Sequence, residues 1–164
     1  MATYTAFHVV ISLIGIGSGL VVAAGLIAGR RFDGWTHLFL ASTVATSVTG
    51  FGFPVDRVLP SHIVGAASLV ALAVAITARY RRHLAGGWRT AYVLAAMVSL
   101  YFNVFVAVVQ SFIRIPALHA LAPTQSETPF AVAQLSVLIV FLALSIAALR
   151  KFKADVATAT PTSV

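Results

Sequence analysis

The sequence predicts an all-α integral membrane protein, a single bundle of about five transmembrane helices with the N-terminus outside and the C-terminus in the cytoplasm. Of its 164 residues, 60% are apolar and 9% are charged, and the mean hydropathy is +0.98. A soluble domain needs roughly a quarter of its residues charged. The surface of this chain is therefore expected to face lipid, and the bilayer is its first expected partner.

The apolar stretches are long enough to cross a hydrocarbon core of about 30 Å at about 1.5 Å per residue. The predicted spans cover residues 5–29, 35–53, 61–78, 90–115 and 129–149. Arg30 follows the first stretch and no basic residue precedes it, which is unlike a cleavable signal peptide. Thr128 and Pro129 are typical of a helix start. We expect one bundle over residues 1–154 and a disordered tail over 155–164.

The basic residues between the predicted spans set the expected orientation. Nine of them fall on one side when five spans are counted: Arg30, Arg31, Arg79, Arg81, Arg82, Arg89, Arg150, Lys151 and Lys153. Arg57 and Arg114 fall on the other side. The positive-inside rule assigns the side with nine to the cytoplasm. The charge bias and compact loops favour a bacterial inner (plasma) membrane.

Composition excludes several functions. The net charge of +7 is concentrated between apolar stretches, where anionic lipid explains it better than nucleic acid, so no nucleic-acid partner is expected. Cysteine is absent, which excludes disulfides, thiolate metal sites, iron–sulfur clusters and covalently attached c-type haem. The four acidic residues lie at or beyond the span ends, which argues against an ion-coupled carrier.

Polar residues at membrane depth are the first candidates for a site, because each is costly in lipid. The fourth predicted span carries Ser99, Asn103, Gln110 and Arg114 at spacings of four, seven and four, which places them on one helix face. The fifth carries Gln134 near its outer end. Asn103, Gln110, Arg114 and Gln134 either bond between helices or line a ligand site.

The histidines are the second group of candidates. His8 and His62 fall near the outer ends of the first and third spans, and His119 falls in an outer loop. Two imidazoles at matched depth suit a bis-His haem b. A third ligand from His119, Asp56 or Glu127 would instead make a Zn²⁺ or Cu²⁺ site from His8, His62 and that residue. Each histidine is also explained as an interfacial residue with its ring among the headgroups.

A relay of two haems across the membrane is excluded by length. His62 and His83 are 21 residues apart, or about 31 Å along a helix, so both would lie at the membrane surfaces. The haem hypothesis is therefore limited to a single site near the outer ends of the spans.

Three functions follow from these observations. The first is a cofactor-binding or metal-binding membrane protein (haem, quinone or transition metal) with a site in the outer half of the bundle, used for redox chemistry. The second is an accessory or assembly subunit of a larger membrane complex. The third is a small-solute carrier or channel that acts as a homo-oligomer.

Overall fold

The computed structural model describes residues 2–53 and 60–152. The predicted disordered tail at 155–164, the basic residues Arg57 and Lys153 and the candidate ligand Asp56 lie outside these ranges. The described chain is helical, with no strand among the described residues.

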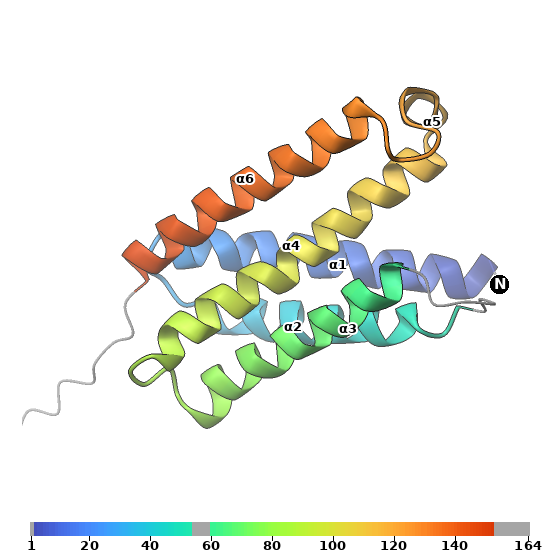
Figure 1. The fold of residues 1–164 in the computed structure, drawn as a ribbon. Coiled ribbons are helices and arrows are strands. Elements are labelled where there is room, and N and C mark those ends of the chain that lie inside the picture. The colour runs from blue at the N-terminus through green and yellow to red at the C-terminus, as the bar shows by residue number, and fades with distance from the viewer. Residues whose placement is uncertain (1, 54–59, 153–164) are drawn as a thin grey trace, which may run out of the picture.

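Figure 1 shows the helices in chain order. They are α1 (Ala2–Ile27), α2 (Asp33–Gly50), α3 (Pro60–Ile76), the π-helical turn η1 (Thr77–Arg81), α4 (Trp88–Arg114), the short α5 (Pro116–Leu121) and α6 (Thr128–Lys151). The long helices run alternately in opposite directions, so α1 begins and α6 ends at opposite ends of the bundle (Figure 1). Each predicted span lies within a few residues of a long helix.

Four helical segments are long and apolar enough to cross a membrane: α1, α3 with η1, α4 and α6. The helix α2 has 18 residues and corresponds to the second predicted span, 35–53, but it is not one of these four segments. Its mean hydropathy is lowered by Asp33, by His37 and by its six hydroxyl side chains. Several of these return their proton to the backbone: Thr36 donates to Phe32 O at 2.9 Å and Ser42 donates to Leu38 O at 2.6 Å. These bonds reduce the cost of placing hydroxyls in an apolar environment.

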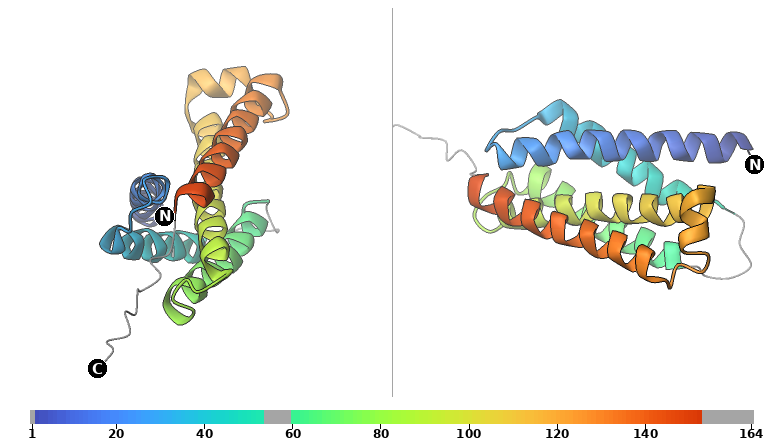
Figure 2. Two further views of the ribbon diagram at one scale, coloured as in Figure 1. Left: turned by 90° about the vertical axis from the view of Figure 1, so that its left-hand side faces the viewer. Right: turned by 90° about the horizontal axis from the view of Figure 1, so that it is seen from above.

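The helix α4 lies between α3 and α6 and also contacts α1 (Figure 2). Its buried face carries Tyr92, Val93, Ser99 and Leu100, all at most 1% exposed. Gly19 of α1 sits where α1 approaches this face and α2: a Cβ at Gly19 would lie 2.5 Å from Leu100 Cδ1 of α4 and 2.9 Å from the Phe39 ring of α2. The glycine thus allows close packing of helices within the chain.

One end of the bundle is strongly basic. The connection between α1 and α2, the connection from η1 to α4 and the end of α6 all lie there (Figure 1). They carry eight of the basic residues assigned above to one side: Arg30, Arg31, Arg79, Arg81, Arg82, Arg89, Arg150 and Lys151. We call this the basic end. Arg114 closes α4 at the opposite end.

Candidate functional site

A cavity of about 520 Å³ opens in the half of the bundle away from the basic end. Residues of α1, α2, the turn after α2, α3 and α4 line it. Five of the residues that the sequence indicated lie on its wall: His8, His62, Asn103, Gln110 and Arg114. Ligand cavities typically occupy about 300–1,000 Å³ and combine apolar walls with a few polar groups. We call this space the outer cavity.

His8 reaches the outer cavity from the first turns of α1, where it is half-buried. Its Nδ1 lies 2.8 Å from the Thr49 hydroxyl oxygen in the last turn of α2. Its ring also packs edge-on against Phe53, with centroids 5.1 Å apart. Tyr4, one turn earlier, donates from its hydroxyl to Thr49 O at 2.6 Å. The imidazole is therefore fixed by contacts from two elements.

The contact with Thr49 relates the proton of His8 to that of the hydroxyl. The Thr49 O–H has two backbone acceptors, Ala45 O at 2.7 Å and Thr46 O at 3.2 Å, and a bond to either of them uses its single proton. Towards His8 the hydroxyl oxygen then acts as the acceptor, so Nδ1 is the N–H donor. In the neutral imidazole the lone pair then lies on Nε2. This arrangement, with one ring nitrogen anchored and the other available, is the one that metal-ligating histidines adopt.

His62 enters from the first turns of α3 and is half-buried. Its ring lies near Phe51, with centroids 5.5 Å apart and an angle of 30° between the planes. Gly65, one turn later, lies beside the same phenyl ring, and a Cβ there would be in ordinary contact with it, 3.4 Å away. Aromatic side chains thus accompany both imidazoles, Phe53 at His8 and Phe51 at His62.

The polar side chains of α4 lie at different depths in the outer cavity. Asn103 is buried, and its Nδ2 donates to the Thr43 hydroxyl of α2 at 3.2 Å. Gln110 and Arg114 are exposed, and Arg114 Nε donates to Gln110 Oε1 at 3.2 Å. Asn103 and Arg114 are eleven residues apart, or about 16 Å along the helix. The outer cavity thus has an amide at depth and a guanidinium at its rim.

Two of the candidate residues lie elsewhere. Gln134 of α6 is half-buried and donates from Nε2 to Phe105 O of α4 at 3.2 Å, so it bonds between helices. His119 is exposed on α5 and does not line the outer cavity. Within residues 2–53 and 60–152, no group of three or more His, Asp or Glu side chains is arranged to hold a metal ion. The three-ligand site built on His8, His62 and His119 therefore has no support from the described residues.

Sequence reasoning missed the hydroxyl groups of this region. Thr46 lines the outer cavity, and its Oγ1 is buried without a hydrogen-bond partner among the described residues. Thr49 orients His8, as shown above. Hydroxyls in a helix usually bond to the backbone four residues earlier, so sequence alone gives them little weight. The signal available was the density of serine and threonine over residues 42–49.

Compared with known proteins, the chain matches no family model, no curated protein and no solved structure. The functional argument therefore rests on the geometry of the described residues.

Proposed function

We propose that this protein is a five-span integral membrane protein that binds a flat redox cofactor in the outer cavity, with haem b as the first candidate and a quinone as the second. The observation that carries the proposal is the convergence of His8, His62 and Arg114, from three different helices, on one cavity. A bacterial inner membrane is the host we propose, with the basic end in the cytoplasm.

The pair of imidazoles supports haem b. A bis-His haem takes one nitrogen from each side of the porphyrin, and His8 and His62 reach the outer cavity from different helices. His8 carries its lone pair on Nε2, as argued above. Arg114 at the rim is a suitable partner for a propionate, because its guanidinium binds a carboxylate through two parallel hydrogen bonds.

The amide at depth supports a quinone as the second candidate. Quinone carbonyls accept hydrogen bonds, and Asn103 Nδ2 and the Thr46 hydroxyl are donors on the cavity wall. The apolar side chains of Val9, Leu13 and Val106 line the same space and suit a ring and an isoprenoid tail.

The span that we add to the four apolar segments is α2, the second in chain order. Its 18 residues extend about 27 Å, close to the thickness of a hydrocarbon core. Its hydroxyls are buried or bonded to its own backbone, while Trp35, Leu38 and Val48 form its exposed surface. With α2 counted, the alternating helices bring eight of the nine described Lys and Arg residues to one end of the bundle, the pattern that the positive-inside rule describes.

Visible spectroscopy of the purified protein tests the cofactor directly. A haem gives a Soret band, which we expect to disappear in His8→Ala and in His62→Ala. His119→Ala is the matched control, because this histidine is exposed and lies outside the outer cavity. A protein without a Soret band is next tested with a short-chain quinone, which should raise its melting temperature in detergent. The proposal would be refuted if the protein showed neither a Soret band nor a rise in melting temperature with quinone. It would also be refuted if the Soret band were lost equally in His8→Ala, His62→Ala and His119→Ala.

A further inference from the structure

A second cavity, of about 250 Å³, lies at the basic end. Arginine, histidine and aromatic side chains make up most of its wall, and the lining residues are Arg31, Asp33, His37, Arg79, Tyr80, His83 and Leu84. They come from the connection between α1 and α2, the first turns of α2, η1 and the loop after η1. We call it the inner cavity. It is separate from the outer cavity and shares no residue with it.

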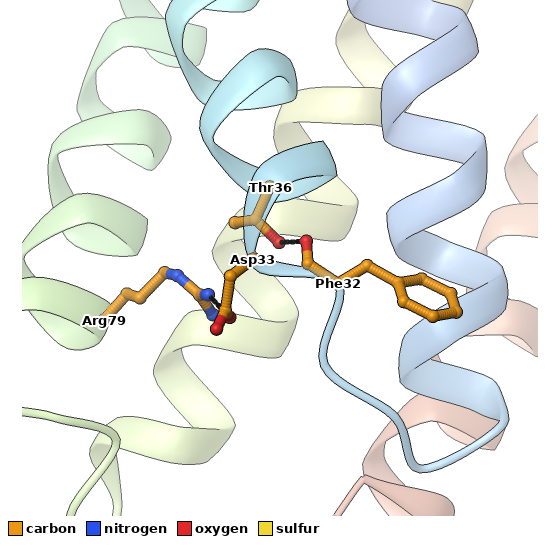
Figure 3. Close-up of polar contacts among 4 residues, drawn as sticks. All are labelled: Phe32, Asp33, Thr36 and Arg79. Carbon is orange, nitrogen blue, oxygen red and sulfur yellow. Dashed lines mark hydrogen bonds and ion pairs between the residues drawn. The ribbon is translucent and has the colours of Figure 1, made fainter.

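Arg79 is the best-ordered cation of the inner cavity. Its side chain is only 10% exposed and forms an ion pair with Asp33, whose side chain is 68% exposed (Figure 3). Its guanidinium carbon also lies 5.6 Å from the centre of the Tyr80 ring and 5.5 Å from that of Tyr92. A buried guanidinium held by a carboxylate and two aromatic rings loses little side-chain entropy on binding an anion.

The other polar side chains of the inner cavity are placed around Arg79 by packing. The His37 ring stacks on Tyr80, with centroids 5.4 Å apart and 15° between the planes. Arg31 is exposed, and its guanidinium carbon lies 5.9 Å from the centre of the Phe152 ring. His83 has a φ of 49°, in the left-handed region, and buried Leu84 follows with a φ of 59°. Burial of Leu84 thus fixes the chain reversal that brings His83 to the cavity.

Cations outnumber acids at this place. Six arginines lie in the connection between α1 and α2, in η1, in the loop after it and in the first turn of α4: Arg30, Arg31, Arg79, Arg81, Arg82 and Arg89. Asp33, in the first turn of α2, is the one acidic residue of residues 28–33 and 77–89. A single carboxylate occupies at most two of the five N–H donors of Arg79. We propose that the inner cavity binds a phosphate group, which uses the guanidinium groups of Arg79 and Arg31 together with imidazole N–H donors of His37 and His83.

Size and position favour a phosphate borne by an anionic lipid headgroup. The volume is below the roughly 300 Å³ at which cavities begin to enclose whole drug-sized ligands, so it suits a single small group. Arginine recognises phosphate through two parallel hydrogen bonds. The cavity lies at the end of the bundle, level with the helix termini, where headgroups surround a membrane protein. A soluble phosphate would use the same donors, so the experiment separates the two sources.

The test measures the melting temperature of the purified protein in a neutral detergent. The probes are short-chain phosphatidylglycerol, short-chain phosphatidylcholine and inorganic phosphate, each titrated to give an apparent Kd. Arg31→Gln is the test variant and Arg30→Gln its matched control. The two arginines are adjacent and exposed, and each packs on a phenylalanine ring, but only Arg31 lines the inner cavity.

We expect phosphatidylglycerol to bind and Arg31→Gln to weaken it about tenfold, the loss of one charge-assisted contact. Arg30→Gln should weaken it less than about threefold, as a non-specific surface charge does. Phosphatidylcholine, which has no net charge, should bind more weakly. Tighter binding of inorganic phosphate, lost in Arg31→Gln, would support the site and assign it to a soluble anion. Equal losses in the two variants, or no binding of any probe, would overturn the proposal.

Discussion

The Nδ1 atom of His8 lies 2.8 Å from the hydroxyl oxygen of Thr49, and this contact joins the start of α1 to the end of α2. When the hydroxyl proton is donated to Ala45 O, Thr49 accepts from His8 Nδ1, and the neutral ring carries its lone pair on Nε2. A contact between residues 41 positions apart in sequence thus determines the chemistry of a candidate ligand.

Replacing Thr49 by valine tests this role, since valine keeps the shape and removes the acceptor. We expect cofactor affinity to fall about tenfold or more, as is usual when the partner of a ligating histidine is lost. Cofactor affinity is measured by reconstitution of the apoprotein. Ser136→Ala is the control, because this exposed serine bonds only to Val132 O on α6. Unchanged affinity in Thr49→Val would show that the hydroxyl does not position His8.

Asn103→Leu should lower the free energy of unfolding by about 1 kcal/mol, because it removes the bond to Thr43 within the bundle. It should also weaken cofactor binding, since Asn103 lines the outer cavity. Gln134→Leu removes a bond between α4 and α6 outside the outer cavity and should affect stability alone. Denaturant titration and reconstitution measure the two effects separately. Loss of cofactor binding in both variants would contradict the placement of Asn103 inside the binding site and Gln134 outside it.

Gly19→Ala should destabilise the bundle by about 1–3 kcal/mol, since the new Cβ would lie 2.5 Å from Leu100 Cδ1 and 2.9 Å from the Phe39 ring. Gly17→Ala, two residues earlier on the same helix, meets nothing within 4 Å among the described residues. That control should be neutral or gain up to about 1 kcal/mol from the higher helix propensity of alanine. Thermal unfolding in detergent compares the stabilities of the two variants. Equal changes in stability would mean that the Gly19 face of α1 does not pack closely against its neighbours.

Single cysteines test the topology, and the absence of native cysteine gives a clean background. A cysteine in place of Thr124, between α5 and α6, should react with an impermeant thiol reagent in intact cells. A cysteine in place of Ala85, between η1 and α4, should react only after the cells are permeabilised. Ala85 is preferable to the neighbouring Gly86, whose φ of 52° would strain a side chain. The reverse pattern would invert the orientation.

Glu127 gives the loop before α6 a dependence on pH. Desolvation raises its pKa, but hydrogen bonds from the Thr124 hydroxyl, from the Thr124 N–H and from the Ser126 N–H lower it by more, so the pKa lies below the ordinary value. The ionised form therefore orders the loop above the unfolded-state pKa of about 4.3. This order is lost as the pH falls through the lowered folded-state pKa.

Amide hydrogen exchange at residues 124–127 measures that change. Exchange should speed up in acid beyond the intrinsic pH dependence in the wild type. Glu127→Gln, which does not titrate, should follow the intrinsic dependence alone, and a titrating response in this variant would assign the effect to another group.

Long apolar stretches made the helices predictable from the sequence. The spans expected at 90–115 and 129–149 correspond to α4 at Trp88–Arg114 and α6 at Thr128–Lys151. Helical spacing alone placed Asn103, Gln110 and Arg114 on one face, and the structure brings that face to the outer cavity. Gln134 was grouped with them by depth, but depth does not determine which way a side chain points about the helix axis.

Features that depend on contacts between distant segments were not predictable. The ion pair between Asp33 and Arg79 joins residues 46 positions apart. The π-helical turn at Thr77–Arg81 has no distinctive sequence, and of the two left-handed residues after it only His83 is a type enriched at positive φ, whereas Leu84 is not. The inner cavity results from these features and was therefore missed.

The inward-facing hydroxyls of α2 have a consequence for biogenesis. A segment so rich in serine and threonine partitions weakly from the translocon into lipid by itself, whereas α1 is strongly apolar. Contacts such as Tyr4 with Thr49 form only when the two helices are paired. We therefore expect α1 and α2 to enter the bilayer together as a helical hairpin, with the second segment retained by the first.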